Sequence, residues 1–434
     1  MSAKHIVILT LGTRGDVQLY VALGVGLRTV GYRVTIAAGH RFKSFITEYG
    51  LEYADSEADF PDIMQSKGGR TALGDSGAAL RPLREVAPIV RRVLDQEWEA
   101  AQGADAIVYH PKALGGYHIA ERLGIPGFLG APFPAFTPTR AFPNLFLPGG
   151  VNLGGPLNHA SYGLFIYLAL APYRGIINGW RKEVLGLPPH PMLAGDILLG
   201  SQRVPKLYCY SAQVIPTPRD FDAASIVTGY WFLEHAAHWQ PPPGLAEFIA
   251  AGQKPIYVGF GSMASHNPRE TTHAVLTALR ATGQRGVLAT GWGGMVASEM
   301  PDNAFLVDSV PHDWLFPQMA AVVHHGGAGT TAAGLHAGKA TVICPFFGDQ
   351  SFWGRRVYEL GVGPKPMPQQ RLTTARLVAG IRAVTTDRMM QSRAHALGER
   401  IRAEDGVARA VEVIRAKLSG VPAHTTMPLV YDEI

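Results

Sequence analysis

Histidines, glycines and threonines gather in one short segment, AAVVHHGGAGTTAAG, which begins at residue 320. An apolar strand is expected to end at His324 and His325, and a helix is expected to open near Thr330 and Thr331. Between them, Gly326, Gly327 and Gly329 let a ligand come close to the backbone. Helix N-termini with free N–H groups bind phosphate, and His324 adds a hydrogen bond or partial positive charge. The segment therefore predicts a diphosphate site, although an ordinary tight βα turn would also use these glycines.

A carboxylate follows the first expected strand of the chain. The stretch GTRGDVQ places Asp16 directly after Gly15, where a parallel sheet exposes its carboxyl-end loops. Asp16 is thus a candidate general base. The alternative is that Asp16 only caps a helix that begins at Val17. Two roles stay open for Arg14, which would pair with Asp16 or face a phosphate.

Two repeats of one pattern must position these groups. Residues 4–38 read as strand, glycine-rich loop, helix and strand, and residues 255–290 repeat that order. Strands that alternate with helices predict α/β domains with doubly wound parallel sheets. We expect one such domain over residues 1–228 and a second over 245–420, joined by the aromatic and proline-rich linker 229–244. Residues 421–434 read as an unpatterned tail.

The composition excludes several classes of protein. The 434 residues are 47% hydrophobic and 17% charged, which is typical of a globular chain and not of a disordered one. The 39 basic and 34 acidic residues are spread without long runs, so nucleic acid is not an expected partner. Cys209 and Cys344 lie in apolar runs, which predicts buried free thiols and a reducing, cytoplasmic location. No apolar run is long enough to span a membrane.

Metal binding is a further alternative for the histidine pair. Neighbouring residues on a strand point to opposite faces, so His324 and His325 would not share an ion. The helix dipole and the threonine hydroxyls offer another way to meet diphosphate charge. We therefore expect neither a metal nor another cofactor.

The segment HHGGAGTT, followed by PFFGDQSFWGRRV, resembles the donor-binding signature of nucleotide-sugar glycosyltransferases with two Rossmann-like domains, the GT-B fold. The stretches GTRGDVQ, GYWF and FGSM are similar to those of sterol 3β-glucosyltransferases. The resemblance implies that Ser262 faces the diphosphate opposite His324 to Thr331. It further implies that Asp349 and Gln350 bind the sugar. Val310 would hold the base through its backbone, and Trp292 would cover it.

The same resemblance implies a metal-independent, inverting transfer of glucose from UDP-glucose to a sterol or similar polycyclic hydroxyl, with Asp16 as the base. The stretch TTAAG carries no acid where plant members hold the ribose with a glutamate. A hydrophobic acceptor pocket is expected from aromatic residues, for which core packing is the alternative: Phe133, Phe136, Phe142, Phe146 and Tyr162. A sterol user would touch a bilayer only peripherally, since no strongly basic amphipathic helix is present.

Other functions stay open. One is a natural-product glycosyltransferase that moves a UDP- or TDP-sugar onto a macrolide, glycopeptide or flavonoid. Two further classes are a nucleotide-sugar 2-epimerase and a nucleotide-sugar binding protein without activity. The polar, glycine-rich residues 64–80 are expected to form a loop, with a lid as one role.

Overall fold

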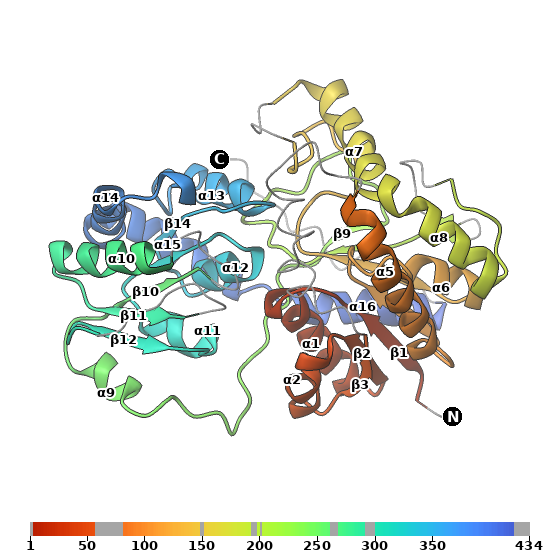
Figure 1. Cartoon of the computed structure of the whole chain (residues 1–434), viewed down its shortest axis with the longest axis horizontal. Helices are drawn as coiled ribbons and strands as arrows, with labels where there is room; N and C mark the ends of the chain where they lie inside the picture. The colour runs from red at the N-terminus through yellow and green to blue at the C-terminus, as the bar shows by residue number, and fades with distance from the viewer. Residues whose placement is uncertain are drawn as a thin grey trace.

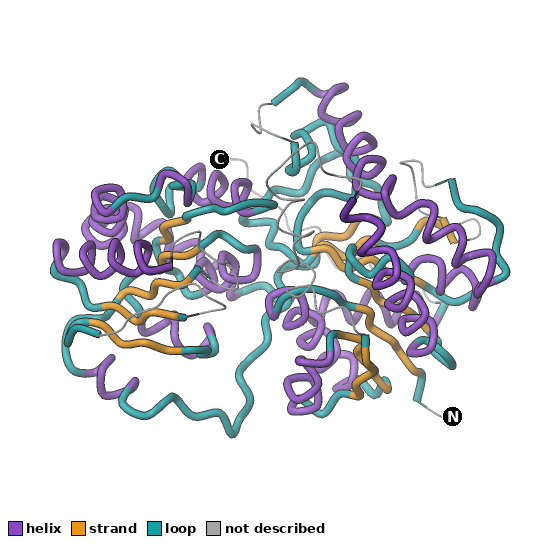
Figure 2. The backbone as a smooth tube through the Cα atoms, viewed as in Figure 1, coloured by secondary structure: helices purple, strands orange, loops and turns teal. Residues whose placement is uncertain are grey.

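The protein is described by a computed structural model that covers residues 3–56, 81–147, 152–191, 198–199, 202–260, 268–290 and 300–420. The expected loop at 64–80 and the tail at 421–434 lie outside these ranges. Two lobes stand side by side, each with its own sheet (Figures 1 and 2). The expected α/β class with two parallel sheets is confirmed.

The N-terminal lobe is built on a seven-stranded sheet in the order β3-β2-β1-β4-β5-β8-β9, in which every neighbouring pair is parallel. Its strands are β1 (His5–Leu9), β2 (Arg33–Ala38), β3 (Glu52–Asp55), β4 (Ala106–Tyr109), β5 (Gly127–Ala131), β8 (Lys206–Tyr208) and β9 (Ser225–Val227). Strands β1 and β4 are wholly buried, since helices cover both faces of a parallel sheet. A short antiparallel pair, β6 (Leu198–Leu199) and β7 (Gln202–Arg203), lies apart.

Helices connect these strands. They are α1 (Arg14–Thr29), α2 (Lys43–Glu48), α5 (Arg81–Ala100), α6 (Gly116–Leu123), α7 (Gly155–Leu170) and α8 (Arg174–Trp180). The apolar segment 155–180 forms two helices, α7 and α8, with a break at Pro172. Proline lacks the N–H that a continuous helix would need there.

The C-terminal lobe carries a five-stranded parallel sheet in the order β12-β11-β10-β13-β14. Its strands are β10 (Ile256–Gly259), β11 (Gly286–Ala289), β12 (Ala304–Val307), β13 (Val322–His324) and β14 (Thr341–Ile343). Its helices are α9 (Leu245–Ala250), α10 (Pro268–Thr282), α11 (His312–Leu315), α12 (Ala328–His336), α13 (Gln350–Glu359), α14 (Thr374–Thr386) and α15 (Arg388–Arg402).

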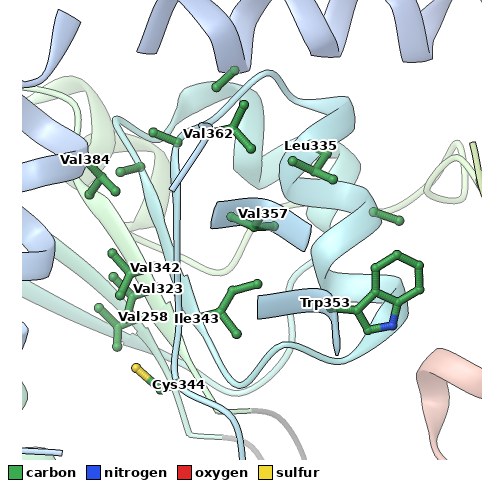
Figure 3. Packing of buried hydrophobic residues seen from close by; sticks show 14 of the residues in the cluster. Val258, Val323, Leu335, Val342, Ile343, Cys344, Trp353, Val357, Val362 and Val384 are labelled. Atoms are coloured by element: carbon green, nitrogen blue, oxygen red, sulfur yellow. The ribbon is translucent and has the colours of Figure 1, made fainter. Parts of the chain in front are cut away.

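Branched apolar side chains from β10, β13 and β14 fill the core of this lobe (Figure 3). Cys344 is fully buried among them, and Cys209 is buried in the N-terminal lobe. Both are free thiols, as the sequence predicts. Burial in apolar surroundings raises the pKa of Cys344 to about 12, so this thiol stays protonated.

The last helix departs from the expected domain boundaries. Helix α16 (Gly406–Ser419) follows the C-terminal lobe in sequence but returns to the N-terminal lobe (Figure 1). Its Ala410, Val411 and Ile414 share one hydrophobic cluster with Val17 and Val21 of α1. The chain therefore crosses between the lobes twice, once through residues 229–244 and once before α16.

Candidate active site

The order of the strands marks where each lobe binds a ligand. In a doubly wound sheet the crevice lies at the carboxyl ends of the two strands from which the chain turns in opposite directions. These are β1 and β4 in the N-terminal lobe and β10 and β13 in the C-terminal lobe. Asp16 follows β1, and the glycine loop from His324 to Gly327 follows β13.

Asp16 lies in the first turn of α1, which begins at Arg14 and not at Val17 as expected. Its Oδ2 accepts hydrogen bonds from Thr13 N at 2.7 Å and Thr13 Oγ1 at 3.1 Å. The residue therefore forms a capping box with Thr13, so the prediction that Asp16 caps a helix is confirmed, for a helix that begins at Arg14. Capping occupies only one of its two oxygens.

The second oxygen faces two basic groups that follow β4. Lys112 Nζ donates to Asp16 Oδ1 at 2.9 Å, and His110 Nε2 lies 3.5 Å from the same atom. His110 Nδ1 accepts from Lys112 N at 3.0 Å, so the neutral ring carries its proton on Nε2, toward Asp16. The Asp16 side chain is 18% exposed and the Lys112 side chain 40%.

These neighbours set the charge of the carboxyl group. Burial alone would raise the pKa of Asp16, but the Lys112 ammonium and the His110 imidazole together hold it well below its usual range. The pKa of His110 is lowered, mainly by burial. Asp16 is thus ionised at neutral pH beside a neutral histidine. Sequence pattern alone does not indicate that His110 and Lys112 meet Asp16, although both residues follow the buried strand at 106–109.

Among the described contacts, Arg14 does not pair with Asp16, the first of its two expected roles. Its guanidinium lies over the Phe45 ring, 4.4 Å from the centroid. The positive charge beside Asp16 comes instead from Lys112.

The loop after β13 depends on Gly326, through its backbone conformation and its hydrogen bond to His324. Gly326 has a φ of +92°, and a Cβ there would lie 2.6 Å from Ile343 Cγ2. The N–H of Gly326 donates to His324 Nδ1 at 2.9 Å, which leaves His324 Nε2 as the donor of the neutral ring. Only glycine fits this turn, because other residues would meet both strain and a clash.

His324 is fully buried, and burial together with the neighbouring histidines lowers its pKa well below the usual value. The ring is therefore neutral at physiological pH, and of the two predicted contributions only the hydrogen bond is supported. Its Nε2 is buried and finds no partner in the part of the chain that the structure describes. A buried donor without a partner costs free energy unless a ligand satisfies it.

Helix α12 begins after this loop, with Gly327 at its N-cap. Gly329 is exposed and Thr330 partly buried in the first turn. Thr331 is fully buried and its hydroxyl donates to Gly327 O at 2.9 Å. Thr330 and the free N–H groups of the first turn are therefore accessible to an anion, whereas Thr331 supports the turn from inside.

The two lobes bring these loops together. A Cβ on Gly329 would lie 3.8 Å from the Cα of Gly15, so the first turns of α12 and α1 face each other. The charges of Lys112 and Asp16 in one lobe also act on Asp349 in the other. The positive ends of two helices, a carboxylate and an ammonium thus meet at one place between the lobes.

Asp349 and Gln350 lie at the start of α13. Asp349 Oδ2 accepts from Trp353 Nε1 at 2.8 Å, and burial raises the pKa of this carboxyl group to about 6. Gln350 is buried, and its Oε1 accepts from the N–H groups of Phe346 and Phe347 at 2.7 and 3.2 Å. Gln350 therefore fixes the loop before α13 with its oxygen, and its Nε2 is the donor left for another partner.

Of the three further residues predicted to contact the donor, only Val310 lies in the described part of the chain. Ser262 and Trp292 lie outside the described residues. Val310 is buried in the cluster under α11, where its side chain contributes to the core and its backbone lies in the loop after β12.

The predicted acceptor aromatics form one group in the N-terminal lobe. Phe133 lies 5.3 Å from Phe146 and 5.8 Å from Phe136, centroid to centroid. These rings and Phe142 are partly buried. Tyr162 is fully buried and its hydroxyl donates to Phe142 O at 3.4 Å, so it supports the group from behind. Core packing, the alternative reading, is correct for Tyr162.

Acidic and histidine side chains give no metal centre in the described part of the chain, where no three of them converge. The chain also carries an Asp-x-Asp pair, Asp220 and Asp222. Asp220 binds Thr139 Oγ1 and Arg140 N, and Asp222 pairs with Arg203. Both carboxylates thus hold loops of the N-terminal lobe together.

Among the described residues, no helix has the length and apolar character needed to cross a bilayer.

Two family descriptions match the chain. "Glycosyltransferase family 28 N-terminal domain" covers residues 6–143, and "Erythromycin biosynthesis protein CIII-like, C-terminal domain" covers residues 290–415. The first match contains Asp16, His110 and Lys112, and the second contains the glycine loop, Asp349 and Gln350. Each match therefore contains one side of the interlobe site.

Relatives extend the match to almost the whole chain. Sterol 3-beta-glucosyltransferase UGT80A2 of Arabidopsis thaliana is 37% identical over 434 residues, which cover 98% of this chain and 67% of the relative. The sterol 3-beta-glucosyltransferase of Emericella nidulans is 37% identical over 94% of this chain, which spans only 30% of that relative. Among solved structures, the calicheamicin glycosyltransferase CalG4 has a TM-score of 0.70 at 18% identity and covers 97% of this chain and 100% of its own.

The predicted GT-B fold is confirmed by this structural match. The plant relative is more than a third identical over 98% of this chain, which spans two thirds of that relative's length. The chain belongs to the sterol 3-beta-glucosyltransferase family of nucleotide-sugar glycosyltransferases.

Proposed function

We propose that the protein transfers glucose from UDP-glucose to the hydroxyl of a sterol or similar polycyclic acceptor, with inversion and with Asp16 as the general base. The observation that carries this proposal is the approach of the first turns of α1 and α12, which sets an ionised carboxylate opposite the glycine loop that we propose to bind the diphosphate. The sterol and the glucose come from the names of the relatives.

The C-terminal lobe would hold the donor. The N–H groups at the start of α12, the Thr330 hydroxyl and the buried His324 Nε2–H are the donors available to a diphosphate. They would also stabilise the charge that develops on the leaving diphosphate, because they are already oriented before the reaction. These groups can act without a metal, and we propose that none takes part.

The N-terminal lobe would activate the acceptor. The acceptor oxygen attacks the anomeric carbon, the bond to the leaving diphosphate breaks, and Asp16 takes the hydroxyl proton. Glycosyl transfer passes through an oxocarbenium-like transition state, and a single displacement inverts the anomeric centre. A weak base is sufficient, since the hydroxyl becomes acidic as its oxygen bonds to the sugar.

Asp16→Asn tests the role of the base. The asparagine oxygen can still accept from Thr13 N, so the cap and the fold should be retained. We expect the rate of transfer from UDP-glucose to cholesterol, followed by mass spectrometry, to fall by about 10²- to 10⁴-fold. Calorimetry should show UDP binding close to that of the parent.

Asp387→Asn is the matched control, since Asp387 also caps a helix, with Oδ1 accepting from Met390 N at 3.0 Å on an exposed surface. Asp387→Asn should transfer at the parental rate. Parental turnover in Asp16→Asn would show that Asp16 only caps the helix.

The same assays distinguish the alternative functions. Release of an epimerised sugar in the absence of an acceptor would indicate an epimerase. Binding of UDP without any transfer would indicate a binding protein without activity. Preference for TDP-glucose and a macrolide or flavonoid would favour a natural-product glycosyltransferase.

A further inference from the structure

Helix α7 exposes an apolar face at the edge of the N-terminal lobe, where its N-terminal end projects from the body of the molecule (Figure 1). Residues 157, 164 and 168 fall on one side of a helix, since they are seven and four positions apart. The large apolar side chains exposed here are Leu157 (61%), Leu164 (52%), Leu168 (58%) and Tyr167 (47%), with Leu153 (44%) just before the helix. Such a concentration of exposed leucine marks an interaction surface.

The opposite face of α7 packs into the protein. Asn158, Ser161 and Tyr162 are buried there. Phe165 stacks on Phe146 with 4.6 Å between centroids and an interplanar angle of 8°, and Phe146 in turn contacts Phe133. The helix thus connects its exposed leucines to the aromatic group that is expected to form the acceptor pocket.

Charge around this helix has one dominant sign. Residues 122–182 contain no Asp or Glu. Arg140 is exposed beside the N-terminus of α7, where its Cβ lies 3.4 Å from a Cβ placed on Gly155, and Arg174 is exposed at the start of α8. Asp220 also lies near the N-terminal end, bound to Thr139 and Arg140 N. Each end of the apolar face therefore has an exposed guanidinium nearby.

We propose that the exposed face of α7 is a membrane-docking surface that rests on a lipid bilayer with anionic headgroups. Leu157, Leu164 and Leu168 would enter the boundary between headgroups and acyl chains, with Tyr167 at the interface, where tyrosine is favoured. Arg140 and Arg174 would face the phosphates. The proposal deepens the proposed function, on which it rests for the acceptor, because a sterol is dissolved in the bilayer.

A protein partner fits this surface less well than lipid. A stable protein interface uses about 20 to 30 residues a side, with hydrogen bonds at its rim. The face of α7 offers a few large apolar side chains and no charged residue within the helix. A shallow apolar face with basic residues at its ends suits a bilayer surface, where apolar side chains meet the acyl chains and basic side chains meet the anionic headgroups.

Vesicle flotation of the full chain tests the proposal without any enzyme assay. The parent should bind vesicles of phosphatidylcholine mixed with phosphatidylserine, and bind those of phosphatidylcholine alone more weakly. The triple variant Leu157→Gln, Leu164→Gln, Leu168→Gln should lose at least about tenfold in binding. Its matched control is Val30→Gln, Tyr358→Gln, Met389→Gln, which replaces other exposed apolar residues and should bind like the parent.

Transfer assays separate this proposal from the proposed function. On cholesterol in detergent micelles the triple variant should match the parent, whereas on cholesterol in vesicles it should be slower by a similar factor to its loss of binding. If the parent binds vesicles through α7 but transfers no glucose, the proposed function is wrong and the membrane-docking surface is still supported. Vesicle binding that is unchanged in the triple variant, or a parental dimer that this variant dissociates, would overturn the docking surface.

Discussion

Asp349→Asn should make the protein more stable at alkaline pH. Burial raises the pKa of Asp349 from 3.8 to about 6, since the ionised carboxylate is poorly solvated and lies within electrostatic reach of Asp16. The folded state therefore holds the proton more tightly than the unfolded state. This carboxyl group favours folding most below pH 3.8, and that contribution is lost as the pH rises through about 6.

The size of the effect follows from the shift. A difference of about two pKa units corresponds to about 3 kcal/mol at about pH 8, and to about half of that at about pH 5. Asparagine carries no charge and keeps an oxygen for Trp353 Nε1, which now donates to Asp349 at 2.8 Å. The variant should therefore gain up to about 3 kcal/mol over the parent at about pH 8, and clearly less at about pH 5.

Thermal unfolding of both proteins at the two pH values measures this difference. For a lobe of this size, 1 kcal/mol corresponds to a shift of about 2 to 4 °C in Tm. Asp387→Asn, an exposed cap, should show no such pH dependence. If Asp349→Asn is equally stabilising at both pH values, or destabilising at about pH 8, the assignment of a buried charge to Asp349 is wrong.

Two other changes probe the two sides of the site. Gly326→Ala should weaken UDP binding by about tenfold or more and lower Tm, because φ is +92° at this position and the new Cβ would clash with Ile343. The matched control is Gly124→Ala, where φ is +64° and a Cβ would meet no atom within 4 Å. This control should leave UDP binding, measured by calorimetry, unchanged. Lys112→Met should raise the pKa of Asp16, because the ammonium that holds it low is removed, and should move the acid limb of the kcat/KM profile upward; Lys112→Arg should keep the pKa low. Coincident profiles for the two Lys112 variants would contradict this pairing.

Local pattern in the sequence is sufficient for the elements and for part of the site. Apolar runs and glycine stops predict the first strand and the strand before the glycine loop, which the structure places at 5–9 and 322–324. These elements are predictable because strand and helix periods are properties of a few consecutive residues. The glycine loop is equally local, since its positive φ and its closeness to a helix start depend on neighbours in sequence. Asp16 is found for the same reason, as a short acid between a strand and a helix.

Only the tertiary structure decides which side chains meet. Lys112 lies 96 residues from Asp16 and reaches it because β4 pairs with β1 in a fixed register. In the same way, α16 joins the N-terminal lobe after the chain has built the other one. Thr331 turns inward and Gln350 binds its own loop, although both have types suited to a ligand. Sequence spacing carries no information on such contacts, because burial and charge at each position depend on groups that folding brings from distant segments.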